Sequence, residues 1–193
     1  MSGERQVKVL FDERTIAERT ETLAREIAAA KPKDLLVVAI LKGSFMFAAD
    51  LLRALHRAGL EPQVEFFHLS SYLSGTVSSG TVKILRDIES SVRDRDVVLV
   101  DDILESGRTL AFAKDLLTAR GARRVLVCTM LEKPGKRAVA ISADFVGFVC
   151  PDVFVVGYGM DVAHSYRELP FIGRVVTSED AGDAAASETV ARV

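Results

Sequence analysis

The strongest constraint on the fold is a run of seven consecutive apolar residues, LLVVAIL, at positions 35–41. A strand with one face in water alternates apolar and polar residues, so an unbroken run is typical of a strand buried on both faces, as in a parallel sheet. A second run, VVLV at 97–100, has the same character. Each run leads through a short polar loop into a predicted helix, at 45–58 and 107–119. The sequence therefore predicts parallel strands connected by helices.

Further apolar segments extend this pattern along the chain. An amphipathic helix is predicted at 15–30, where Ile16, Leu23 and Ile27 share one face. The remaining predicted strands are 64–69, 82–85, 124–130, 145–149 and 153–156. Strands that alternate with helices of about a dozen residues indicate an α/β fold with a doubly wound sheet.

The composition fits one globular domain without a broad charged surface. Of the 193 residues, 49% are hydrophobic and 27% charged, which is enough for a sizeable core. With 25 basic and 27 acidic side chains the net charge is −2, so we expect neither a nucleic-acid partner nor a membrane surface. Residues 178–193 carry four acids and one base, and this tail, rich in Ala and Ser, is expected to be disordered.

The sequence shows no targeting or membrane segment. Its apolar runs are shorter than the ~18–20 residues that span a bilayer, and no apolar stretch precedes the first acids at the N-terminus. The two cysteines, Cys128 and Cys150, form no disulfide framework or CxxC motif and are predicted to be core residues. We therefore expect a cytoplasmic protein.

The segment 97–110, VVLVDDILESGRTL, is the strongest candidate for a functional site. A buried strand is followed by Asp101, Asp102 and Glu105, and a Ser-Gly-Arg-Thr turn then begins a helix. Ligands of open α/β sheets bind beyond the carboxyl ends of strands, and the backbone N–H groups at a helix N-terminus suit a phosphate. Acids beside such a site can bind sugar hydroxyls or a metal ion. A loop of solvated acids that only caps the helix is the alternative.

Other common site types are not supported. The chain has no GxxxxGK[ST] phosphate loop, and no GxGxxG motif follows a strand. The histidines His56, His68 and His164 are scattered and are interpreted as surface or packing residues. Residues 70–80, SSYLSGTVSSG, are either a plain surface loop or a mobile lid.

Five segments in sequence order resemble the hypoxanthine-guanine phosphoribosyltransferases, members of the type I phosphoribosyltransferase family. The segment 97–110 resembles the family's phosphoribosyl-pyrophosphate signature. LKGSF at 41–45 resembles its pyrophosphate loop, and Ser71-Tyr72 its flexible catalytic loop. LEKP at 131–134 resembles the segment that carries the purine-reading lysine. The family's hood is matched by FVGF at 145–148, Pro151-Asp152, FVVGYGMD at 154–161 and Tyr166-Arg167.

This resemblance implies a parallel-sheet type I phosphoribosyltransferase fold with a small hood and a flexible active-site loop. The domain would span 1–177, with the hood built from the N-terminal segment and about 145–177, and 178–193 would form the tail. The implied reaction belongs to purine salvage and moves a 5-phosphoribosyl group from phosphoribosyl pyrophosphate to N9 of hypoxanthine or guanine. The resemblance also implies Mg²⁺ as cofactor and a homodimer or homotetramer.

By resemblance, the residues that bind the sugar donor come from three segments. Asp101 and Asp102 would bind the ribose hydroxyls, partly through Mg²⁺, and Asp161 would bind a second Mg²⁺. A cis peptide is expected between Leu41 and Lys42. The full set of expected donor-binding residues is Lys42, Gly43, Asp101, Asp102, Ser106, Gly107, Arg108, Thr109 and Arg167.

On the purine side the resemblance assigns Lys133, Phe154, Val155 and Asp161. Lys133 would donate to purine O6, which distinguishes 6-oxopurines from adenine. Phe154 would stack on the base, and the Val155 backbone would read its edge. Glu105 stands where the family usually has aspartate, the proposed general base at purine N7. Its extra methylene moves the carboxylate by roughly 1.5 Å, a shift that matters unless the loop accommodates it.

Two alternatives remain from the sequence. A phosphoribosyltransferase-fold regulator that binds nucleic acid would need a basic face, and the body of this chain is near neutral. A sister transferase that prefers xanthine or a pyrimidine is the other alternative. Lys133 and Phe154 favour 6-oxopurines, but the sequence does not rank hypoxanthine, guanine and xanthine.

Overall fold

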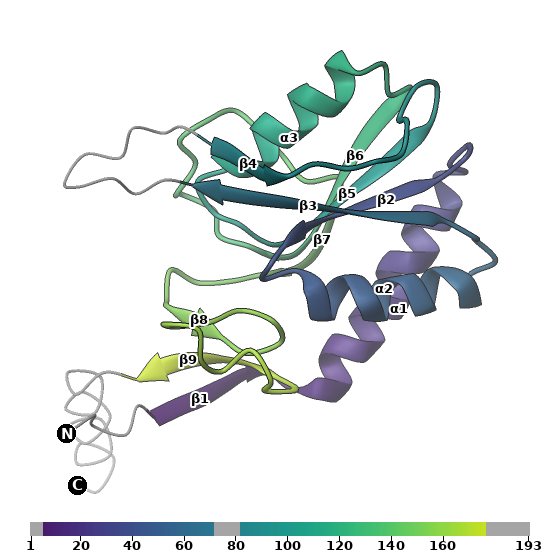
Figure 1. Ribbon diagram of the computed structural model, residues 1–193. Coiled ribbons are helices and arrows are strands. Elements are labelled where there is room, and N and C mark those ends of the chain that lie inside the picture. Colours follow the sequence, from purple (N-terminus) through teal and green to yellow (C-terminus); the bar gives the residue numbers. More distant parts are fainter. Residues whose placement is uncertain (1–5, 72–81, 177–193) are drawn as a thin grey trace, which may run out of the picture.

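A computed structural model describes residues 6–71 and 82–176 of the chain (Figure 1). The expected tail 178–193 and Tyr72 of the expected flexible loop lie outside this part, as does the side chain of Ser71. The elements in chain order are β1 (Gln6–Phe11), α1 (Glu13–Ala29), β2 (Leu36–Leu41), α2 (Phe45–Arg57), β3 (Gln63–Ser71), β4 (Val82–Arg86), β5 (Asp96–Leu104), α3 (Arg108–Ala119), β6 (Arg124–Glu132), β7 (Phe145–Val149), β8 (Val155–Val156) and β9 (Ile172–Val176).

A six-stranded sheet forms the centre of the molecule, with the strand order β4-β3-β2-β5-β6-β7. All neighbouring strands in it are parallel except β3 and β4, which are antiparallel. The two apolar runs become β2 and β5, which lie side by side in the middle of the sheet. The predicted α/β fold with a mostly parallel sheet is confirmed.

Each face of the central sheet packs against its own helices, as Figure 1 shows. Val37 and Ala39 of β2 belong to the core shared with α1 and α2, whereas Leu36 and Val38 belong to the core shared with α3. Successive side chains of a strand point to opposite faces, so a strand covered on both sides must be apolar throughout. This two-sided burial explains why the run at 35–41 shows no alternation.

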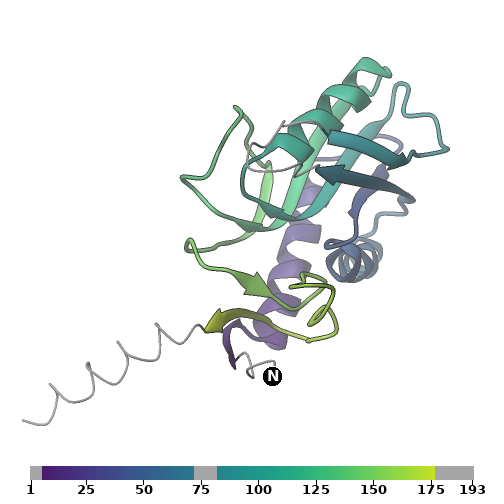
Figure 2. The same ribbon diagram turned by 60° about the vertical axis from the view of Figure 1, so that its left-hand side comes forward.

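A second, three-stranded sheet lies beyond one edge of the main body and consists of β1, β9 and β8 (Figure 2). Its strands are antiparallel, with Gln6 opposite Val176 and Val155 opposite Arg174. Of the residues expected in the hood, β8 and β9 lie in this small sheet, whereas β7 pairs with β6 in the main one. None of the helices in the described residues is long and apolar enough to cross a bilayer.

Candidate active site

The two adjacent aspartates of the signature segment lie inside β5 and not after its end. The sequence placed the end of the strand at Val100, but pairing with β6 continues past Asp101, which is opposite Thr129, to Leu104, which is opposite Glu132. Asp101 is buried. Because the neighbouring strand supplies ladder partners, the carboxylates are held on rigid backbone at the carboxyl end of the sheet.

The surroundings of this pair disfavour two negative charges. Burial and the adjacent charge of Asp102 raise the pKa of Asp101 well above its ordinary range. Burial also raises the pKa of Asp102, although hydrogen bonds and the positive charge of Arg167 act in the opposite direction. A pair of buried carboxylates of this kind favours a bound cation or hydroxyl donors from a ligand.

A cavity of about 300 Å³ opens at these aspartates and continues to the N-terminus of α3. It brings together seven of the predicted site residues, namely Gly43, Asp101, Asp102, Glu105, Ser106, Gly107 and Thr109. The first N–H groups of a helix have no partner within the helix and carry the positive end of its dipole. One wall of the cavity is therefore acidic, while another suits an anion.

Gly107 lets the turn before α3 pass close to a neighbouring segment. Its φ is +79°, and a Cβ atom there would lie 2.5 Å from Cγ2 of Ile141. Both the backbone conformation and the lack of space select glycine at the N-cap of α3. The turn is thus fixed from outside by residues that follow β6.

The expected pyrophosphate loop joins β2 to α2 and meets the aspartates directly. The peptide bond between Leu41 and Lys42 is cis, as the resemblance predicted. The buried hydroxyl of Ser44 donates to the carbonyl of Ile40 at 2.6 Å and closes the loop. A Cβ atom on Gly43 would lie 1.7 Å from Oδ2 of Asp102, so the loop approaches that carboxylate as only glycine can.

The segment after β8 packs on the pyrophosphate loop from the other side. A Cβ atom on Gly159 would lie 2.1 Å from the carbonyl oxygen of Gly43. Arg167 donates to the carbonyl of Gly159 at 2.6 Å and pairs with Asp161 at 2.7 Å. Asp161 also accepts from the N–H of His164. Arg167 and Asp161 therefore form one unit beside the loop, and neither lines the cavity.

Lys133, one of the residues assigned to the purine, is in contact with Glu105, the expected general base. Nζ of Lys133 lies 3.4 Å from Oε1 of Glu105, and the lysine side chain is only 8% exposed. Lys133 follows directly after β6, and its N–H donates to the carbonyl of Leu104 at the end of β5. The ends of two neighbouring parallel strands thus hold an ammonium group and a carboxylate side by side.

The other predicted residues lie around this centre without lining the cavity. Lys42 is exposed, and Val155 is buried in β8. The side chain of Phe154 is 57% exposed, and its carbonyl accepts from the N–H of Val175. The structure therefore leaves Phe154 accessible for stacking.

Arg108 begins α3, directly after the turn that Gly107 forms. Cys128 and Cys150 are both buried with free thiols, as expected for core residues. Burial raises the pKa of each thiol, so neither is an activated nucleophile.

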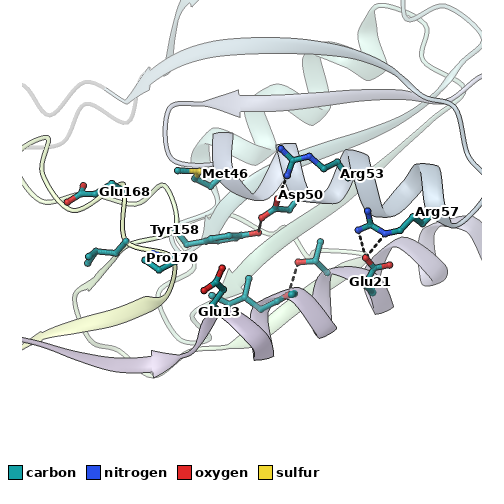
Figure 3. A pocket seen from close by; sticks show the side chains of 13 residues that line it. Glu13, Glu21, Met46, Asp50, Arg53, Arg57, Tyr158, Glu168 and Pro170 are labelled. Atoms are coloured by element: carbon teal, nitrogen blue, oxygen red, sulfur yellow. Dashed lines mark hydrogen bonds and ion pairs between the residues drawn. The ribbon is translucent and has the colours of Figure 1, made fainter.

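A larger cavity of about 440 Å³ lies elsewhere, between α1, α2 and the segment after β8 (Figure 3). It contains none of the predicted site residues. Tyr158 reaches across it, and its hydroxyl donates to Asp50 on α2 at 2.8 Å. The smaller cavity is the better candidate for the active site, because seven of the predicted site residues line it.

Comparison with known proteins agrees with this geometry. The family model described as phosphoribosyl transferase domain matches residues 6–163. The hypoxanthine phosphoribosyltransferase of Escherichia coli K12 is 40% identical over 177 residues, which cover 90% of this chain and 98% of that protein. The bifunctional protein TilS/HprT of Listeria innocua is 48% identical over 167 residues, or 86% of this chain. The chain spans only 25% of the length of that bifunctional relative.

The similarity extends to solved structures. The hypoxanthine phosphoribosyl transferase of Trypanosoma cruzi superimposes with a TM-score of 0.85 and 34% identity, over 96% of this chain and 99% of that one. The signature in β5, the cis peptide before Gly43 and the lysine after β6 occupy one region of the shared fold. The chain therefore belongs to the phosphoribosyl transferase domain family and, within it, to the hypoxanthine phosphoribosyltransferases.

Proposed function

We propose that this chain is a purine-salvage transferase that moves a 5-phosphoribosyl group from phosphoribosyl pyrophosphate to N9 of hypoxanthine or guanine. The products are the purine nucleotide and pyrophosphate. The observation that carries the proposal is the single cavity that joins the Asp101–Asp102 pair to the N-terminus of α3, with Glu105 at its edge. The names of the full-length relatives supply the acceptor base.

In this proposal the 5-phosphate binds at the start of α3. The N–H groups of the first turn, which have no partner within the helix, and the hydroxyls of Ser106 and Thr109, two residues that line the cavity, would bind it there. The pyrophosphate lies on the other side, against the backbone of Lys42 and Gly43, and Arg167 supplies positive charge there. Asp101 and Asp102 lie between these two anion sites and accept from the ribose hydroxyls.

Mg²⁺ fits this donor set as the expected cofactor. Magnesium is commonly bound by one or two carboxylates together with substrate oxygens. Asp101 and Asp102 are adjacent, and burial raises the pKa of both, so a cation would relieve their repulsion. When bound, the ion would offset negative charge on the pyrophosphate that departs. Asp161 is engaged with Arg167 and would need to leave that ion pair to bind a second ion.

Lys133 and Glu105 suit the donor and the proton acceptor that the purine requires. The ammonium group of Lys133 donates to O6 of the base, and the carboxylate of Glu105 accepts a proton from the purine ring as N9 attacks. Their contact at 3.4 Å shows that both groups reach one point. A purine that binds there replaces this ion pair with two hydrogen bonds, one from Lys133 and one to Glu105. N9 of the purine then attacks the positive ribosyl centre while the purine loses its proton to Glu105.

One assay tests the proposal. The purified chain is mixed with phosphoribosyl pyrophosphate, Mg²⁺ and hypoxanthine, guanine, xanthine or adenine in parallel, and nucleotide formation is measured. We expect turnover with hypoxanthine or guanine and none with adenine, because the adenine amino group at position 6 cannot accept from Lys133. Removing Mg²⁺ with a chelator should abolish turnover, and returning it should restore activity. A preference for xanthine, or no turnover with any base, would overturn the proposed substrate.

The remaining expectations concern the whole molecule. A homodimer or homotetramer is part of the proposal, and light scattering of the purified chain tests it. The relative from Trypanosoma cruzi was studied for the effect of its C-terminal region on its oligomeric state. The cytoplasmic location and the domain limits 1–177 stay predictions.

A further inference from the structure

Arg137 binds several backbone carbonyls near the candidate active site without lining its cavity. Its Nη1 lies 2.8 Å from the carbonyl oxygen of Leu104, 2.6 Å from that of Glu105 and 3.2 Å from that of Lys133. Its Nη2 donates to the carboxylate of Glu132. An η nitrogen has two hydrogens, so the longest contact shares one of them. A single guanidinium therefore binds the backbone of Glu105 and of Lys133, two of the residues expected to contact the purine.

The contact with Glu105 also affects the phosphate site. In a trans peptide the C=O and the N–H of the next residue point in opposite directions. A guanidinium that holds the carbonyl of Glu105 therefore turns the N–H of Ser106 away from itself. Arg137 does not line the cavity, whereas Ser106 does. The arginine thus orients one of the backbone donors that the phosphate needs.

Two further residues after Lys133 also contact the turn at 106–107. The N–H of Ala138 donates to the carbonyl of Ser106 at 2.9 Å. Ile141 occupies the space that a side chain at position 107 would need. The side chain of Arg137 is 22% exposed, and it is the charged group at the centre of this contact.

We propose that Arg137 is a positioning residue that couples the phosphate subsite to the purine subsite. It fixes the backbone of Glu105 and Lys133 relative to each other, and through the same peptide it orients the N–H of Ser106. The inference rests on the proposed function, because it assigns purine and phosphate to the two ends of this contact. It places no group of Arg137 on the substrate.

The fork of an arginine is required for this role. A guanidinium presents five N–H donors in a planar array, so it can bind several carbonyls and a carboxylate together. A lysine keeps the charge but has one nitrogen on a flexible stem. Arg137→Lys should therefore lose the coupling even though charge and approximate length are retained.

The test compares Arg137→Lys and Arg137→Ala with Lys136→Ala. Lys136 is the adjacent residue, and its side chain forms an exposed ion pair with Asp152. For each protein we would measure kcat, the KM of both substrates, the Kd of inosine monophosphate and the Kd of pyrophosphate with Mg²⁺. The nucleotide spans both subsites that Arg137 couples, whereas pyrophosphate occupies the site at Gly43.

For both Arg137 variants we expect the Kd of inosine monophosphate to rise about tenfold or more and kcat to fall by about ten- to a hundredfold. The Kd of pyrophosphate should stay within about twofold of wild type, as should every constant of Lys136→Ala. Guanidinium ion at tens of millimolar should restore part of the kcat of Arg137→Ala, and ammonium ion should not. General loss of structure would weaken both ligands alike and would not be rescued.

If Arg137→Ala does not fold, Glu132→Gln provides the second variant, because it removes the charged partner that orients the guanidinium. It should show the same selective loss to a smaller extent. The inference is overturned if the Arg137 variants bind inosine monophosphate like Lys136→Ala, or if pyrophosphate binding falls equally. Failure of the wild-type chain to form any nucleotide would instead overturn the proposed function.

Discussion

Nζ of Lys133 lies 3.4 Å from Oε1 of Glu105, although the two residues come from different strand ends. The lysine is nearly buried, whereas the glutamate is 45% exposed and faces the cavity. In the proposed function both groups contact the purine, and in this structure each is the partner of the other. We therefore expect a change of Lys133 to affect mainly the KM of the purine and a change of Glu105 to affect mainly kcat.

Lys133→Gln should weaken the use of the purine while sparing the donor. A hydrogen bond from a charged group contributes about 1.5–3 kcal/mol, so we expect the KM of the 6-oxopurine to rise at least about tenfold. Lys133 lies outside the phosphate turn, so the KM of phosphoribosyl pyrophosphate should change by less than about twofold. Steady-state kinetics with each substrate varied in turn measures both values. An unchanged purine KM would show that Lys133 serves only to neutralise Glu105.

Glu105→Gln should lower kcat by about 10²–10⁴, the usual contribution of a positioned proton acceptor. The thermal midpoint should hardly change, because this side chain faces the cavity and adds little to the core. Glu105→Asp retains the charge but withdraws it by roughly one C–C bond, about 1.5 Å, from the point it shares with Lys133. We expect a several-fold loss of kcat for this variant.

These two substitutions of Glu105 also distinguish the explanations for its unusual length. If the loop is built around glutamate, the aspartate variant is slower than wild type, as we expect. Should the aspartate variant be equal or faster, the site tolerates either length. Retention of more than half of the wild-type kcat by the glutamine variant would rule out Glu105 as the proton acceptor.

Gly43→Ala should damage the pyrophosphate site and leave the fold intact. The new methyl group would meet the carboxylate of Asp102 at 1.7 Å, so the loop, the carboxylate or both must move. We expect the KM of phosphoribosyl pyrophosphate to rise at least about tenfold and kcat to fall. Gly135→Ala is the matched control, because among the described residues only its chain neighbours lie within 4 Å of a Cβ there, although its φ of +90° adds some backbone strain. Equal kinetics for the two variants would contradict the close approach.

The sequence predicts the central sheet well because its pattern is local. An apolar run between two helical patterns can be recognised without knowing its partners; β2 formed where expected, and β5 begins close to the predicted residue although it continues past Val100. The strands β1 and β9 were not predicted, because half of β1 is exposed and its alternation with polar residues such as Lys8 is short. These strands exist because they pair with each other across nearly the whole chain.

The site shows the same division between local and distant information. Adjacent aspartates suggest the end of a strand, since aspartate is disfavoured in strands, but pairing with β6 overrides that preference. Two motifs, 97–110 and 131–134, identify Glu105 and Lys133 from the sequence. Their contact and the proposed role of Arg137, however, depend on how the segments after β5 and β6 lie relative to each other. The residues expected to bind ligands were predicted from the sequence, whereas the residue proposed to position them required the structure.

Tyr158→Phe should loosen the segment that packs on the pyrophosphate loop. The phenol donates to Asp50 across the larger cavity, as Figure 3 shows, and the next residue, Gly159, lies against the carbonyl of Gly43. Burial and the bond to Asp50 raise the pKa of Tyr158, so the hydroxyl stays a donor over the working pH range. We expect a loss of about 1.5–3 kcal/mol in the free energy of unfolding.

The kinetic effect of Tyr158→Phe should be confined to the donor. The KM of phosphoribosyl pyrophosphate should rise two- to fivefold, about what a small shift of Arg167 and Gly159 would produce, with the purine KM unchanged. Asp50→Asn is the control, because its amide oxygen can still accept from the phenol, and it should behave more like wild type. A stability loss with no change in donor KM would limit Tyr158 to a structural role.

Asp96→Asn should make stability less dependent on pH. The buried Asp96 begins β5, and its Oδ2 accepts from the N–H of Lys33 at 2.9 Å, from Arg124 at 2.8 Å and from Arg123. Burial alone would raise the pKa of this carboxyl, but the three donors outweigh it and hold the pKa below its ordinary value. The folded state therefore binds a proton less readily than the unfolded chain does.

The sign of the pH effect follows from this depressed pKa. The stabilisation is fully present above the unfolded pKa of about 3.9, and it is lost as the pH falls from there through the lower folded pKa. We expect Asp96→Asn to lower the free energy of unfolding by about 2–3 kcal/mol at pH 7 and pH 5.5, with a smaller difference at pH 3.5. Urea unfolding at the three pH values measures this. Glu89→Gln, which breaks an exposed pair with Arg86, should cost less than about 0.5 kcal/mol throughout. A constant difference between wild type and Asp96→Asn at all three values would show that the carboxylate charge is not what stabilises this end of β5.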